Sequence, residues 1–310
     1  MLRSFVVRCL LFATLVVGLL LVVWLVPDRV LGESFQYAIF DKRAALAKPA
    51  SPGRIILVGG SNVVFGVYSP ILEEAFGLPV VNAALHGGHG LAFTLREVGP
   101  YVRSGDHIVL LPEYANFLGQ VVHGGYPLSE LTLIDPSVAR RLSSDQLQRA
   151  VGDAPQILLR KTAQLVRQLL GRPRPDRPYD RDDFNANFDI VGHWGLSAAP
   201  VASVRMTGEI NSATRSIIAD FCSDAAAVGA TCYLSYPSLN AGSYAKTDEA
   251  LMQDIYTEMR ATGLPLVGSP DRYTFPDSLH YDTYYHLGKE AQFERTRRLA
   301  EDLRAAGCCP

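Results

Sequence analysis

Along most of the chain, short apolar runs that fit buried β-strands alternate with longer stretches of helical periodicity. Strands are predicted at 54–59, 78–83, 107–111, 231–235 and 265–267. Helices are predicted at 69–77, 91–101, 210–228, 247–261 and 287–305. Because strands that alternate with helices form right-handed βαβ units, the pattern predicts a parallel sheet covered by helices on both faces, a three-layer α/β/α fold.

The N-terminus shows a different pattern, because residues 9–26 form one apolar run without a charged side chain. Its length nearly spans the hydrocarbon core of a membrane. Arg3 and Arg8 precede it, which places residues 1–8 in the cytoplasm. We therefore expect a single-pass anchor in a bacterial-type inner membrane, with an extracytoplasmic, periplasmic C-terminal domain. A cleaved signal peptide is the competing interpretation, since small residues follow the run near Gly32.

Beyond the anchor, residues 27–53 are predicted to be a connector and 54–310 a single catalytic domain. The alternation of strands and helices is interrupted at about 119–207, where one helix is predicted at 154–170 before a charged, proline-rich stretch at 171–183. So long an interval without strands is typical of an insertion. It is either a lid that shapes a substrate cleft or a surface excursion.

Composition narrows the function classes. With 48% hydrophobic residues, 19% charged residues and a net charge of −2, the chain lacks the basic surface that a nucleic-acid partner requires. Cys222 and Cys232 are ten residues apart and either form a disulfide in an oxidising compartment or stay free. His86 and His89 share a loop without a carboxylate or third histidine, so we expect them to line a polar cleft and predict no metal site.

Candidate chemistry lies after the predicted strands, where parallel α/β sheets bind their ligands. Ser61 follows two glycines after the first strand, in a run that matches neither dinucleotide-binding nor P-loop spacing. The glycine-rich loop after the second strand exposes backbone N–H groups. After the third strand, the Asn116 amide is placed to donate to an oxyanion, while Glu113 is either an acid in the site or a solvated surface group.

A further pair of chemically useful residues precedes the last helix, in the D-x-x-H sequence of Asp277 and His280. The carboxylate can accept the Nδ1 proton of the imidazole, which leaves Nε2 free to take the proton of a serine hydroxyl. Together with Ser61, this pair predicts a Ser-His-Asp triad.

In this order the blocks resemble those of the SGNH-hydrolase superfamily, which is also called GDSL-like. The resemblance covers roughly 54–305 and implies a flavodoxin-like α/β fold without a bound cofactor. It implies a catalytic triad of Ser61, Asp277 and His280.

The resemblance also implies an oxyanion hole formed by Ser61, Gly87 and Asn116. The chain departs from the family in having G-G-S in place of G-D-S and in lacking a G-x-N-D sequence. Gly88 is an alternative to Gly87.

The string F-P-D-S-L-H-Y-D-T-Y-Y-H-L-G-K-E is similar to the final block of a membrane-anchored subgroup. That subgroup includes proteins of alginate and other exopolysaccharide O-acetylation and of teichoic acid D-alanylation. The resemblance implies an esterase or O-acetyltransferase that acts on an envelope or secreted polysaccharide, with a multi-pass membrane acyl-donor protein as partner if it is a transferase. Two alternatives stay open: a catalytically silent accessory or scaffold protein of exopolysaccharide assembly, and a secreted lipase or esterase.

Overall fold

The computed structural model describes residues 2–26, 34–171 and 179–309. Its centre is a parallel sheet with the strand order β2-β1-β3-β4-β6. The strands are β1 (Ile55–Gly59), β2 (Val80–Asn82), β3 (His107–Leu111), β4 (Thr231–Ser235) and β6 (Leu266–Val267). The predicted parallel sheet is therefore confirmed. All of β1 is buried, which explains its uninterrupted apolar run.

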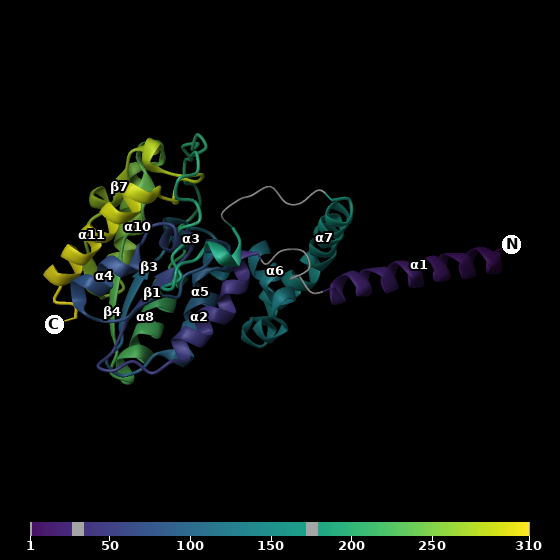
Figure 1. Cartoon of the computed structure of the whole chain (residues 1–310), viewed down its shortest axis with the longest axis horizontal. Helices are drawn as coiled ribbons and strands as arrows, with labels where there is room; N and C mark the ends of the chain where they lie inside the picture. The colour runs from purple at the N-terminus through teal and green to yellow at the C-terminus, as the bar shows by residue number, and fades with distance from the viewer. Residues whose placement is uncertain (1, 27–33, 172–178, 310) are drawn as a thin grey trace.

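Helices cover both faces of this sheet (Figure 1). On one face, α4 (Ser69–Phe76) packs against α11 (Lys289–Ala305). On the other, α5 (Leu91–Val98) packs against α8 (Ala213–Ala227). The remaining helices of this body are α3 (Ser61–Val64), α9 (Ala241–Lys246) and α10 (Glu249–Arg260), beside a two-stranded sheet of β5 (Leu239–Asn240) and β7 (Thr274–Phe275).

The segment predicted to be a connector contains a helix that belongs to the body. Helix α2 (Ala38–Ala47) packs beside β2. The ammonium group of its buried Lys42 donates to the backbone oxygens of Asn82 at 2.7 Å and Phe188 at 3.2 Å. Residues 34–53 therefore fold onto the domain instead of linking it to the anchor.

The N-terminal apolar run forms α1 (Leu2–Leu25), a helix of 24 residues with mean hydropathy 2.8 in its most apolar window. At 1.5 Å per residue it is about 36 Å long, enough to cross a membrane. It projects away from the body, and none of its residues is buried (Figure 1). Gly32, near the candidate cleavage site, lies outside the described residues.

The insertion contains two helices that pack against each other, α6 (Tyr126–Ile134) and α7 (Ser144–Leu169). Helix α7 begins ten residues earlier than predicted, because Ser143 and Gln146 form a capping box that starts it. The described residues of the insertion add no strand to the five-stranded sheet.

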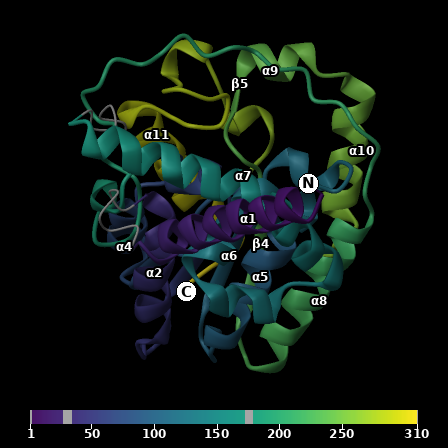
Figure 2. The ribbon, with the colours of Figure 1, turned by 90° about the vertical axis from the view of Figure 1, so that its right-hand side faces the viewer.

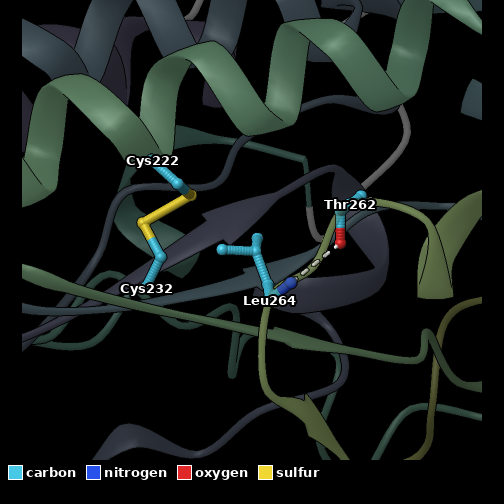
Figure 3. The surroundings of a disulfide bond; sticks show 4 residues. All are labelled: Cys222, Cys232, Thr262 and Leu264. Atoms are coloured by element: carbon cyan, nitrogen blue, oxygen red, sulfur yellow. Dashed lines mark hydrogen bonds between the residues drawn. A yellow bond between two sulfur atoms is a disulfide. The ribbon is translucent and has the colours of Figure 1, made fainter.

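A disulfide bond joins α8 to β4, which settles the pairing that the sequence left open. Figure 3 shows Cys222 on the helix reaching down to Cys232 on the strand. Their Cα atoms are 5.8 Å apart, an ordinary distance for a disulfide.

Candidate functional site

A cavity of about 550 Å³ lies at the carboxyl ends of the central strands. Ser61, Gly87 and Glu113, which follow β1, β2 and β3, line its floor. In the sheet, β2 lies on one side of β1 and β3 on the other, so the direction of the chain across the sheet reverses here. Open parallel sheets bind their ligands in the crevice at such a switch point. Helices α6 and α7 supply part of the wall, so the insertion shapes the cleft.

The turn that carries Ser61 is held by its neighbour Asn62. The Asn62 side chain accepts the Gly60 N–H at 3.1 Å and donates to the Leu111 carbonyl at 3.0 Å. A Cβ at Gly59 would lie 2.5 Å from the same Leu111 oxygen, so only glycine permits this approach of the two strand ends. The hydroxyl of Ser61, at the first position of α3, is thereby set at the cavity floor.

Beside Ser61, the space between two glycines is filled by the side chain of Glu113. The Ser61 hydroxyl donates to its Oε1 at 3.4 Å. A Cβ at Gly60 or at Gly87 would lie 2.4 Å from one of its oxygens, so both glycines are required by this carboxyl group. Glu113 is only 8% exposed, which excludes the solvated surface group that the sequence left open.

The protonation of Glu113 decides what this group can do. Burial raises the pKa of Glu113, and the nearby His286 and the hydrogen bonds from Asn62 and Ser61 only partly oppose this. A raised pKa favours the neutral carboxyl group, which can donate a hydrogen bond where a carboxylate can only accept.

A histidine that the sequence analysis did not single out, His286, lines the same cavity. Its Nδ1 lies 2.7 Å from Oδ1 of Asp282 and 3.3 Å from the hydroxyl of Tyr179. That hydroxyl also donates to the other oxygen of Asp282. Burial alone would raise the pKa of Asp282, but the hydrogen bonds from His286 and Tyr179 hold it below its ordinary value. A charged carboxylate therefore faces Nδ1.

The ring of His286 is fixed next to the turn of Ser61. It stacks on the buried ring of Phe65, with centroids 4.0 Å apart and planes 8° from parallel. Phe65 follows Ser61 by four residues at the end of α3, so the two side chains lie on the same side of one helical turn. Within the described part of the chain, the hydrogen bonds of the His286 ring involve Nδ1 and not Nε2. Ser61 and His286 thus line one cavity, and Asp282 is bonded to the imidazole without lining that cavity itself.

The expected Asp277 and His280 pair is not assembled, and this part of the predicted triad needs correction. The carboxylate of Asp277 accepts the Gly242 N–H at 2.8 Å and the Ser203 hydroxyl at 3.2 Å. His280 is 2% exposed, and neither ring nitrogen finds a hydrogen-bond partner among the described residues. Neither Asp277 nor His280 lines the cavity of Ser61. In the D-x-x-H sequence, the carboxylate is thus bonded to Gly242 and Ser203, while the imidazole is buried without bonding to it.

The expected oxyanion hole is brought together only in part. Ser61, Gly87 and the alternative Gly88 line the cavity. Asn116 does not: it lies in a 3₁₀ turn (Tyr114–Phe117), it is 3% exposed, and its amide nitrogen has no partner among the described residues. The reason is the distance of each residue from the end of β3. Glu113 comes two residues after β3 and already occupies the place next to Ser61.

The histidines of the second loop have ordinary structural roles. Nδ1 of His86 accepts the Gly88 N–H at 2.8 Å, and Nε2 of His89 lies 3.1 Å from the side-chain oxygen of Gln36. Burial lowers the pKa of His86 to about 4. Of the two, only His86 lines the cavity.

Ligand atoms close enough to hold one metal ion occur elsewhere in the described structure. His107, Cys308 and Cys309 each offer one within 4.8 Å of the others. His107 is the first residue of β3, so this group lies at the amino end of that strand. The cavity is at the carboxyl ends of the strands, so the group takes no part in the site described above.

No model of a known protein family matches the chain, and no curated protein matches it at a significant level. Among solved structures, the X-ray crystal structure of protein YXIM from Bacillus subtilis is similar, with a TM-score of 0.38 and 13% identity over 84% of this chain. The match covers 58% of that protein, so this chain spans less than two thirds of its length. A likeness at this TM-score carries no argument about fold or activity.

Proposed function

We propose that the cavity is the active site of an extracytoplasmic serine acyl-ester enzyme of the SGNH type. In this proposal Ser61 is the nucleophile, His286 the general base and Asp282 the group that orients the imidazole. The observation that carries it is the hydrogen bond between Asp282 and Nδ1 of His286, on a ring stacked one helical turn from Ser61 in the same cavity. This is the arrangement by which a carboxylate and an imidazole activate a serine hydroxyl.

The chemistry follows from these positions. Nε2 of His286 takes the Ser61 proton as the serine oxygen attacks the ester carbonyl carbon, and the carbonyl oxygen becomes an oxyanion. The oxyanion collapses, the alcohol leaves with the proton from His286, and the acyl group stays on Ser61. Water or a sugar hydroxyl, deprotonated by His286, then releases the acyl group as an acid or as a new ester.

Glu113 replaces the expected asparagine as the third donor to the oxyanion. As a neutral acid it donates from the side of Gly87, next to the N–H of Ser61, whereas as a carboxylate it would repel the developing negative charge. One such donor is typically worth about 3 kcal/mol in the transition state. The site then works only while Glu113 keeps its proton.

The wider setting supports an anchored enzyme of the cell envelope. Helix α1 has the length and composition of a membrane anchor, and a disulfide in the body fits an oxidising compartment. The strand order, with β2 and β3 on either side of β1, is that of flavodoxin-like sheets. The resemblance to the polysaccharide O-acetylation subgroup makes an O-acetylated glycan the proposed substrate class and a membrane acyl-donor protein the proposed partner.

A serine-directed fluorophosphonate tests this function. The full-length chain in detergent should be labelled at Ser61 and should hydrolyse p-nitrophenyl acetate, and Ser61→Ala should lose both properties. Ser203→Ala is a matched control, because Ser203 also donates to a carboxylate but lies outside the cavity. A chain that is neither labelled nor active would contradict the proposal and favour the silent accessory protein, in which the Glu113 carboxylate blocks the site.

A further inference from the structure

Helix α7 exposes a continuous apolar face that nothing in the described structure covers. Large side chains on this face are exposed, with Val151 at 69%, Leu159 at 64% and Leu169 at 78%. At 100° per residue, these positions together with Leu147 and Val166 fall within an arc of about 120°. About six turns of apolar surface are thus presented to the outside.

The other sides of α7 are polar or packed against the body. Arg149, Arg160 and Arg167 fall within about 20° of one another, far from the apolar face. Arg149 donates to the Gly124 carbonyl at 3.1 Å, and the Arg160 guanidinium lies 5.4 Å from the ring centroid of Tyr126. The helix is therefore amphipathic, with its apolar side turned away from the protein.

The position of α7 relative to α1 indicates what covers this face. The Lys161 ammonium group donates to the backbone oxygen of Trp24, in the last turn of α1, at 3.2 Å. Figure 1 shows α1 leaving the body on the side where α7 lies, and Figure 2 shows α7 next to α1, at an angle to it. A helix that contacts the end of a membrane-spanning helix, where that helix leaves the bilayer, lies at the level of the membrane surface.

We infer that α7 is an interfacial helix that lies on the membrane anchored by α1, with its apolar face in the lipid. This inference rests on the proposed anchor and goes beyond the proposed function. Helices with one apolar and one charged face bind bilayers in this way, about 5–10 Å deep at the boundary of headgroups and acyl chains. Lipid, rather than a protein partner, is the occupant because α7 contacts the end of the spanning helix, where that helix leaves the bilayer.

The orientation has a consequence for the cavity. Its wall includes Trp24 of α1 and Ile157, Leu158 and Gln164 of α7, while Ser61 lies on its floor. With α7 on the membrane, the cavity opens beside the lipid surface. An acyl group carried by a molecule of the bilayer then reaches the serine without crossing the aqueous phase.

Tryptophan quenching by lipids with brominated acyl chains tests the inference. The full-length chain is reconstituted into phosphatidylcholine vesicles as two variants, Leu159→Trp on the apolar face and Gln156→Trp on the exposed polar side. The two native tryptophans, Trp24 and Trp194, give the same background emission in both variants. The Leu159→Trp emission should be shifted to shorter wavelength and quenched about twofold more strongly than that of Gln156→Trp. Leu159 is exposed, so the larger side chain has room.

Equal quenching of the two variants would overturn the inference, and so would an unquenched Leu159→Trp, which is the result expected if a protein covers the face. Flotation of the vesicles separates this failure from that of the anchor. A chain that does not float with lipid overturns the anchor and the inference together, whereas a chain that floats with equal quenching overturns the inference alone. None of these outcomes bears on labelling of Ser61.

Discussion

Two aspartate and histidine pairs lie within ten residues of each other on the loop before α11, and they have opposite surroundings. Asp277 accepts from the Gly242 N–H and makes no hydrogen bond to His280, and the imidazole of His280 is buried without a hydrogen bond among the described residues. Asp282 and His286 contact each other at 2.7 Å, and the imidazole lines the cavity of Ser61. Both pairs have residue types suited to a triad.

The difference shows what a catalytic histidine needs beyond a carboxylate nearby in sequence. One ring nitrogen must be held by an acceptor, and the other must be free and reachable by the nucleophile. His286 meets both conditions, and Phe65 fixes its ring plane. For His280, burial lowers the pKa to about 4, which the nearby Thr283 and Asp277 only partly oppose, and neither ring nitrogen makes a well-formed hydrogen bond among the described residues. The two histidines therefore differ in their access to the cavity and in their hydrogen-bond partners, and sequence distance from an aspartate does not reveal this difference.

The largest expected effect comes from exchanging the two histidines in turn for glutamine. His286→Gln should lower kcat/KM for p-nitrophenyl acetate by about 10³-fold, because it removes the general base. His280→Gln should leave it nearly unchanged. Steady-state hydrolysis by the full-length chain, with circular dichroism to show that both variants are folded, measures the contrast. The reverse ranking would restore the D-x-x-H histidine as the base.

The two aspartates give a smaller contrast. Asp282→Asn should lower kcat/KM by about 10²-fold, since the amide can donate to Nδ1 and so favour the tautomer whose Nε2 carries the proton. In Asp277→Asn, the side-chain oxygen can still accept from the Gly242 N–H, so activity should persist. Hydrolysis rates of both variants decide, and equal losses would mean that neither aspartate orients the base.

The fold was largely predictable because its strands and helices carry strong local patterns. Strands at 107–111 and 231–235 match their predicted bounds, and Gly77 ends α4 in the left-handed conformation that glycine favours. Helix α2 was missed because it lies in the short stretch between the anchor and the first strand, and its buried residues include a lysine, Lys42. Such burial is explained only by the carbonyl oxygens that receive its ammonium group in the folded chain.

The site was predictable only where a strand end fixes it. Ser61 and Gly87 lie in the loops that follow β1 and β2, and both line the cavity. Asp282 and His286 stood in the same quoted string as the D-x-x-H sequence, but only the turn geometry shows which imidazole faces the serine. A stronger signal was available in the run Y-D-T-Y-Y-H, whose aspartate and histidine are four residues apart.

A third prediction concerns the pH range in which the His286 pair works. On the alkaline side activity should fall as pH passes the raised pKa of Glu113, because the carboxylate then opposes the oxyanion. Glu113→Gln keeps a neutral donor at every pH, so it should lose the alkaline decline and exceed the wild type there by about tenfold.

A pH profile of kcat/KM checks this, with Glu130→Gln as the control, since Glu130 lines the same cavity and is bonded to Gln36 instead of Ser61. An unchanged alkaline limb in Glu113→Gln would show that this limb has another origin. A loss of activity as large as that of Ser61→Ala would make Glu113, rather than His286, the base.

The smallest effect is on stability, and it isolates the buried histidine. At pH values between 6.5 and about 4, His280 is protonated in the unfolded chain but neutral in the folded protein, where burial lowers its pKa. The free energy of unfolding therefore decreases as pH falls through this range. His280→Leu removes this pH-dependent loss of stability, and it also removes the two ring nitrogens that have no hydrogen-bond partner among the described residues. We expect it to raise the free energy of unfolding at pH 7 by about 1 kcal/mol and by more at pH 5.

The matched control is His193→Leu. Burial also lowers the pKa of His193 to about 4, but its Nε2 donates to the Leu287 carbonyl at 3.0 Å. Its replacement leaves that oxygen unpaired, so it should cost stability at pH 7 where His280→Leu adds it. Urea unfolding of the three proteins at both pH values measures these differences. If His280→Leu is instead destabilised like His193→Leu, the buried imidazole of His280 has a hydrogen-bond partner in solution. The contrast with His286, which is bonded to Asp282, is then smaller than the structure indicates.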